Sequence, residues 1–208
     1  MAAPATYTLL PEASALANVR NTLSGTCVRF VSPSGLTDAT DSTNIQAAID
    51  SVQFASGPYA YGAVLLSGEY ILTVPLKIGD VNVVGEVALH GIGTAKLTYN
   101  PAVTPTPGAS PYAIEIYKCR WAQGAVMRDI NLWCSWKSRG ILFATVNGSL
   151  ENVSVWNTIE AGMDFIDCWN LNVRNCAVKQ FAGFGARLHE CNACHFDSLI
   201  LDEGYAVY

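Results

Sequence analysis

Residues 127–132 read Met127-Arg128-Asp129-Ile130-Asn131-Leu132, and the same pattern recurs three more times at a fixed step of 23 along the chain. Each copy runs apolar, charged, small polar, apolar, any residue, apolar. The later copies are Leu150-Glu151-Asn152-Val153-Ser154-Val155, Val173-Arg174-Asn175-Cys176-Ala177-Val178 and Phe196-Asp197-Ser198-Leu199-Ile200-Leu201. A fixed period in the low twenties is typical of a solenoid, in which each repeat stacks on its neighbours.

Residues at the same phase of the repeat are expected to form columns, because paired strands on successive coils lie about 4.8 Å apart. Two of these columns are apolar and predict the interior of the solenoid. They consist of Ile130, Val153, Cys176 and Leu199, and of Leu132, Val155, Val178 and Leu201. Burial of each aliphatic side chain stabilises the fold by about 1.5–3 kcal/mol.

Two polar columns run beside the apolar ones. The small polar column is expected to bond to turn backbone, and it consists of Asp129, Asn152, Asn175 and Ser198. The charged column alternates in sign and consists of Arg128, Glu151, Arg174 and Asp197. Opposite charges on neighbouring strands favour this register, although an exposed pair contributes only about 0–1 kcal/mol.

A second face of the solenoid repeats at the same step. Residues 162–168 match residues 185–191. Residues 140–143 match the start of residues 162–168, but the step between them is one residue shorter. Gly204 to Tyr208 begin a further copy that has no cap. Because an uncovered end strand promotes aggregation, we expect either a continuation of the chain or a partner at this end.

The first half of the chain carries different signals. Residues 1–35 form a lead-in, with a helix around Leu16 to Leu23 and a strand at Cys27 to Val31. The solenoid is predicted to occupy residues 36–208. A helix over residues 43–53 begins with a capping box at Thr43 and Gln46 and places Ile45, Ala48, Ile49 and Val52 on one face. Short strands are predicted from Gly62 onward, at residues 63–66, 69–72, 75–78 and 81–84, and a Pro-rich loop is predicted at residues 101–111.

Composition excludes several classes of function. The 208 residues carry a net charge of -5 and only 14% charged side chains, which gives no basic stripe for nucleic acid. No apolar run is long enough for a membrane helix, and the first residues lack the features of a secretory signal. The seven cysteines are interpreted as reduced, buried residues of a protein made in a cytosol. We expect no cofactor and no metal.

The segments that precede the repeat resemble the pectate-lyase-like family of right-handed parallel β-helix proteins. The resemblance lies in residues 37–50, in Gly62-Ala63-Val64-Leu65-Leu66-Ser67-Gly68-Glu69-Tyr70, and in Val87-Ala88-Leu89-His90-Gly91-Ile92-Gly93. It implies an all-β, single-stranded, right-handed parallel β-helix whose N-terminal end is capped by an α-helix. The family includes lyases, hydrolases, epimerases, phage tailspikes and adhesins, so fold alone does not give the function.

Within that family, the lead-in resembles phage tailspike and tail-fibre proteins. This implies a virion protein that forms a homotrimer, contacts other virion proteins and attaches to host surface polysaccharide. The absence of a signal is consistent with assembly in a host cytoplasm, and secretion stays open as the alternative. A polysaccharide hydrolase or lyase acting on acidic polysaccharide is the second interpretation, and a purely structural capsid or tail component is the third.

Candidate catalytic residues follow from the step of 23, because glycoside hydrolysis needs two carboxyl groups about 5–9.5 Å apart. Asp167 and Glu190 have the same phase, His189 precedes Glu190, and Asp164 has the same phase as Arg187. A solvated polar face with a salt bridge is the competing interpretation. The hydrolase and lyase motifs of the family are not found in the sequence.

Candidate ligand-binding residues are Arg187 and two tryptophans, Trp133 and Trp156, which are also separated by one step of the repeat. Indole faces bind sugar rings, but packing between coils or at a subunit interface is the competing interpretation. Residues 191–195 match the Cys-x-x-Cys-His spacing of covalent haem. Because Cys191 has the same phase as Cys168, we interpret this match as ordinary repeat positions.

Overall fold

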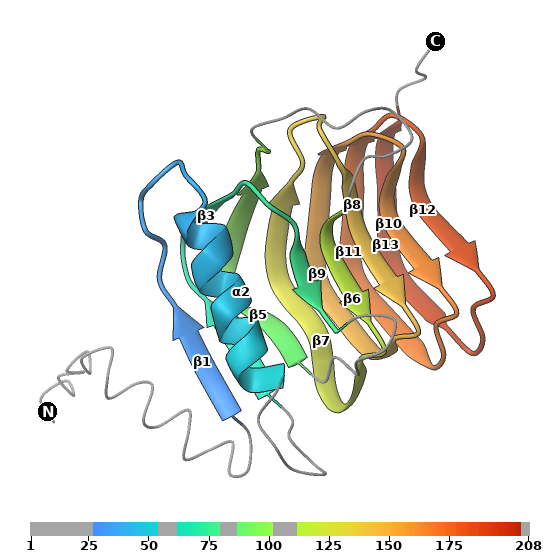
Figure 1. Ribbon diagram of the computed structural model, residues 1–208. Helices are drawn as coiled ribbons and strands as arrows, with labels where there is room; N and C mark the ends of the chain where they lie inside the picture. Colours follow the sequence, from blue (N-terminus) through green and yellow to red (C-terminus); the bar gives the residue numbers. More distant parts are fainter. Residues whose placement is uncertain (1–26, 54–61, 80–86, 102–111, 205–208) are drawn as a thin grey trace, which may run out of the picture.

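The computed structural model describes residues 27–53, 62–79, 87–101 and 112–204. These residues form a right-handed parallel β-helix of about five turns with a helix near its N-terminal end, which confirms the expected fold (Figure 1). The lead-in helix, the strand predicted at residues 81–84 and most of the Pro-rich segment lie outside the described residues.

Two parallel sheets make up the coils. The long sheet contains β1 (Cys27–Val31), β2 (Gly62–Leu66), β3 (Glu69–Leu72), β5 (Val87–Tyr99), β7 (Arg120–Trp133), β9 (Asn147–Thr158), β11 (Leu171–Phe181) and β13 (His195–Gly204). The short sheet contains β4 (Leu76–Ile78), β6 (Tyr112–Tyr117), β8 (Arg139–Ala144), β10 (Ala161–Ile166) and β12 (Phe184–His189). Because β1 pairs with β2 along its whole length, the solenoid begins inside the segment interpreted as a lead-in.

The register of the long sheet is the one that the repeat predicts. Ile130 pairs with Val153, and Cys176 pairs with Leu199. Ile130 and Val153 are fully buried, as expected of an interior column. The charged column also keeps its register, since Glu151 pairs with both Arg128 and Arg174.

The small polar column marks a corner in each of the four coils that contain β7, β9, β11 and β13. Asp129, Asn152, Asn175 and Ser198 have φ values of 55°, 54°, 50° and 60°, in the left-handed region. Asn and Asp tolerate this region better than most residues, which explains their recurrence at this phase. The amide of Asn152 donates to Asp129 Oδ1 at 3.0 Å, so the column also links adjacent coils through side chains.

The capping helix α2 spans Thr40–Gln53 and begins three positions earlier than predicted. Its side chains Ile45, Ile49 and Val52 are fully buried, and it packs against the first coils. Figure 1 shows α2 beside β1, at the N-terminal end of the stack.

The early start of α2 is capped by Asp38, whose Oδ1 accepts a hydrogen bond from the Thr40 N–H at 2.8 Å. Polar side chains within α2 make tertiary contacts. The buried Asp41 carboxylate accepts hydrogen bonds from the backbone N–H of Ser34 at 2.7 Å and of Ile71 at 2.8 Å. The predicted capping partner Gln46 instead exchanges two 2.9 Å hydrogen bonds with the backbone of Lys77. These contacts join the helix to β3 and β4, and they are tertiary, so no local sequence signal predicts them.

Candidate functional site

The predicted site residues lie in three places. Asp164 and Arg187 face each other on the short sheet, where they pair in the register of β10 and β12. Asp167, Glu190 and His189 lie at the end of these strands or in the turns that follow. Trp133 and Trp156 pair with each other on the long sheet.

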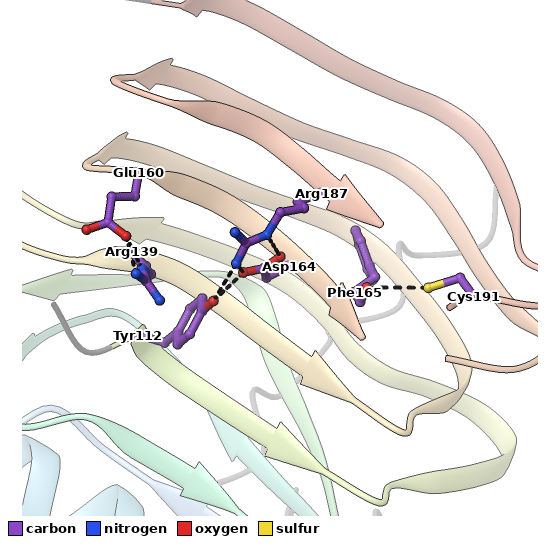
Figure 2. Close-up of polar contacts among 7 residues, drawn as sticks. All are labelled: Tyr112, Arg139, Glu160, Asp164, Phe165, Arg187 and Cys191. Atoms are coloured by element: carbon purple, nitrogen blue, oxygen red, sulfur yellow. Dashed lines mark hydrogen bonds and ion pairs between the residues drawn. The ribbon is translucent and has the colours of Figure 1, made fainter. Parts of the chain in front are cut away.

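Asp164 is the centre of a buried polar network. Its neighbours Met163 and Phe165 point into the solenoid, so Asp164 points outward, yet its side chain is fully covered. Arg187 Nε donates to Asp164 Oδ1 at 2.7 Å, and Arg187 Nη2 and the Tyr112 hydroxyl both donate to Oδ2. Figure 2 shows Arg187 and Tyr112 converging on this one carboxylate.

The network raises the pKa values of Tyr112 and Arg187. Burial, together with the hydrogen bond to Asp164, raises the pKa of Tyr112 to about 12, so the phenol stays neutral. The same carboxylate raises the pKa of Arg187. Since both oxygens of Asp164 accept hydrogen bonds, this geometry favours a positioning role, in which Asp164 holds a partly exposed Arg187 in place.

A second ion pair lies next to this network (Figure 2). Arg139 Nε donates to Glu160 Oε2 at 2.5 Å, and the Arg139 guanidinium lies 5.3 Å from the ring centroid of Tyr112. Sequence reasoning missed Tyr112, Arg139 and Glu160. The repeat slips to a step of 22 here, since Ile141 pairs with Met163, and Glu160 lies one position before the residue level with Arg139. The separation of Arg139 and Glu160 is therefore 21, and a search at the regular step does not pair them.

A pocket of about 400 Å³ opens beside these charges. One of its lining residues is Phe184, which is 58% exposed. The pocket is lined by Ile159, Glu160, Ala161, Ala182, Gly183, Phe184 and Arg187. It therefore combines an apolar wall with one fixed anion and one fixed cation, a combination that suits an amphipathic ligand.

The turns after β10 and β12 bring two predicted carboxylates onto consecutive coils. Asp167 and Glu190 have φ values of 53° and 54°, and Asp167 N–H donates to the His189 carbonyl at 2.8 Å. Asp167 Oδ1 also accepts a hydrogen bond of 3.0 Å from the indole of Trp169. His189 and Glu190 are exposed.

The two predicted tryptophans form a stacked pair across adjacent coils. The rings of Trp133 and Trp156 are 5.0 Å apart and nearly parallel, at 2°. The ammonium groups of Lys96 and Lys179 lie 6.0 Å and 5.1 Å from the Trp133 and Trp156 rings, respectively. The two indoles thus pack against each other between coils, and their contact with a sugar stays a prediction.

The cysteines of the haem-like spacing occupy repeat positions. Cys191 Sγ lies 3.4 Å from the Phe165 carbonyl of the preceding coil, and Cys168 is fully buried (Figure 2 shows Cys191). Burial raises the pKa of Cys168 to about 12.

Within the described ranges, no three His, Cys, Asp or Glu side chains are grouped to hold a metal ion. No described helix has the length and apolarity to cross a membrane.

Comparison with known proteins finds similarity at the level of fold. No family model and no curated protein matches the sequence. Among solved structures, ORF18 of Geobacillus virus E2 superposes with a TM-score of 0.53 at 16% identity. The superposition covers 86% of this chain and 44% of the viral protein, so this chain spans less than half of that protein's length.

Two further structures are similar at lower scores. A putative glycosyl hydrolase from Parabacteroides merdae has a TM-score of 0.40 at 13% identity, covering 83% of this chain and 96% of that protein. The A-module of the mannuronan C-5 epimerase AlgE6 from Azotobacter vinelandii has a TM-score of 0.38 at 17% identity, covering 82% and 61%. The neighbours thus include a phage protein and carbohydrate-active enzymes.

Proposed function

We propose that this chain is a virion-associated β-helix protein that attaches to host surface polysaccharide. It would serve as a tailspike, tail-fibre or surface-decoration subunit. One observation carries the proposal: the exposed ring of Phe184 stands at a pocket whose rim holds Glu160 and Arg187. Sugar rings present apolar C–H faces and hydroxyl groups at once, and this pocket offers a partner for each.

Preorganisation supports binding at this pocket. Arg139 holds Glu160, and Asp164 holds Arg187, before any ligand arrives. A site whose polar groups are already ordered loses less conformational entropy on binding. Glu160 then accepts hydrogen bonds from sugar hydroxyls, and Arg187 donates hydrogen bonds to them.

The virion location is supported by the resemblance of the lead-in sequence to phage tailspike and tail-fibre proteins. The fold shared with a protein of Geobacillus virus E2 is consistent with it, at the level of fold alone. Within this proposal the chain forms a homotrimer and contacts other virion proteins. A secreted protein is the alternative.

The test is binding to a panel of immobilised bacterial surface polysaccharides. Phe184→Ala removes a ring that lines the pocket, and we expect it to weaken binding about 10-fold, equivalent to about 1.4 kcal/mol. Ile92→Ala is the matched control, because Ile92 is 50% exposed on the long sheet, away from the pocket. Equal binding by wild type and Phe184→Ala would contradict the proposal, as would a lack of binding to every polysaccharide.

Cleavage of polysaccharide, by a hydrolase or a lyase reaction, is the second candidate function. It is favoured by the same-phase position of Asp167 and Glu190 on consecutive coils, since strands about 4.8 Å apart bring carboxyl groups close to the separation of about 5–5.5 Å in retaining glycosidases. Release of sugar by wild type, lost in Glu190→Gln, would support it. Glu190→Gln is a more specific test than an Asp167 variant, because Asp167 also accepts a hydrogen bond from the Trp169 indole.

A further inference from the structure

A second recess lies at the other end of β10 from the Phe184 pocket. It has a volume of about 450 Å³ and is lined by Thr145, Val146, Asn147, Trp169 and Asn170. It is built from two consecutive turns, one after β8 and one after β10. Sequence reasoning placed no ligand here.

Trp169 presents an exposed but well-held aromatic surface at this recess. Its side chain is 52% exposed. Its indole N–H donates to Asp167 Oδ1 at 3.0 Å, and its backbone N–H donates to the Val146 carbonyl at 3.1 Å. Trp169 also forms a β-bridge with Asn192 on the next coil. The ring is therefore oriented in advance, and it is more exposed than the half-buried Trp133 and Trp156.

The chemistry around Trp169 selects for a neutral ligand. Asn147, Asn170 and Thr145 offer amide and hydroxyl groups, which donate and accept hydrogen bonds without charge. Among the described residues, no charged side chain lines the recess, so it offers no ion pair to an anionic ligand. An indole face beside uncharged hydrogen-bonding groups matches a sugar ring that carries only hydroxyl groups.

We propose that this recess is a second carbohydrate subsite, in which a neutral sugar ring stacks on Trp169. The inference rests on the proposed polysaccharide binding and deepens it. The two recesses share β10, with Ala161 lining the first and Trp169 following its C-terminal end. A strand of this length spans about 17–20 Å, so one extended polysaccharide chain reaches both recesses and gains affinity from occupying them together.

The direct test is a titration of the isotope-labelled protein with neutral monosaccharides (glucose, galactose and mannose), followed through the indole N–H resonances. The Trp169 resonance, assigned with Trp169→Phe, is expected to shift with at least one neutral sugar and to stay unchanged with glucuronate. The indole resonance of Trp136, another exposed tryptophan, reports non-specific effects. An unchanged Trp169 resonance with all neutral sugars, or an equal shift with glucuronate, would overturn the subsite.

A second experiment separates this inference from the proposed function. On the polysaccharide panel, Trp169→Ala is expected to weaken binding about 10-fold, equivalent to about 1.4 kcal/mol. Trp136→Ala, which removes another exposed tryptophan, is expected to leave binding unchanged. If Phe184→Ala weakens binding and Trp169→Ala does not, the subsite is wrong and the proposed function stands. If neither variant changes binding, the proposed function is wrong, and the titration alone shows whether Trp169 binds a neutral sugar.

Discussion

At the residue scale, Asp164 is the side chain on which the short-sheet network depends. Asp164→Ala removes the acceptor shared by Arg187 and Tyr112 and leaves the Tyr112 hydroxyl without the carboxylate to which it donates. We expect the variant to lose about 2–3 kcal/mol of unfolding free energy. This is less than the cost of breaking a fully buried ion pair, because Arg187 is partly exposed. Urea denaturation measures this loss.

The matched control for Asp164 is Asp197→Ala, because Asp197 is exposed on β13 and its removal is expected to cost under about 0.5 kcal/mol. A catalytic Asp164 would behave differently: its loss would abolish sugar release with little change in stability. Unfolding of Asp164→Ala at the wild-type urea concentration would therefore contradict the positioning role.

The same network shows how far residue-level prediction reaches. The pairing of Asp164 with Arg187 follows from their separation of 23 along the chain, and the structure confirms their register. Tyr112 could not be found in this way, since it lies 52 residues before Asp164. The step on the short sheet is irregular before Asp164, because Ile114 pairs with Ile141, 27 residues later, and Ile141 pairs with Met163, 22 residues later. The burial of Asp164 could not be predicted from the sequence either, because an outward position in a strand is normally exposed.

At the scale of the secondary-structure element, the corner residues hold the long strands in shape. Asn152 has a φ of 54° within β9, and a β-branched residue in this region costs about 1–2 kcal/mol. Asn152→Val is expected to lower the unfolding free energy by that amount, whereas Asn152→Gly, which accepts positive φ, is expected to lower it less. Thermal or urea unfolding measures the difference.

Asn172→Val is the matched control for the corner, because it makes the same replacement in β11 at a position outside the left-handed region. A valine favours extended strand there, so stability is expected to stay within about 0.5 kcal/mol. Equal losses in Asn152→Val and Asn172→Val would show that the side chain, and not the backbone conformation, matters at the corner.

Elements were predictable where the signal is local or periodic. The strands at Cys27–Val31, Gly62–Leu66 and Glu69–Leu72 follow from alternation and turn residues, and the structure confirms them. The start of α2 was misplaced because Gln46 contacts β4 instead of the helix N-terminus. The small polar column was predictable as a column, but its left-handed conformation follows only from the corner geometry.

At the scale of the whole molecule, exposed apolar side chains gather on the last two described strands. Phe184 and Leu188 on β12 are 58% and 51% exposed, and Ile200 and Leu201 on β13 are 55% and 49% exposed. With only 14% charged residues in the chain, few charges oppose association. Leu188 and Leu201 are register partners of the fully buried Phe165 and Val178, so their exposure follows from their place on the last described coil. Ile200 pairs with the half-buried Ala177 on the outer face, and its apolar side chain is the one that the proposed trimer would cover.

The trimer proposal predicts a particle with three times the 22.3 kDa mass of one chain. Light scattering over a dilution series measures it, and a monomer at every concentration would contradict the proposal. Ile200→Lys places a charge on the outer face of β13 and is expected to lower the trimer fraction, because burying an unpaired ammonium group is costly. Ile92→Lys, at a similarly exposed position on β5 (50%), is expected to leave the trimer intact. Equal effects of the two lysines would place the contact away from β12 and β13.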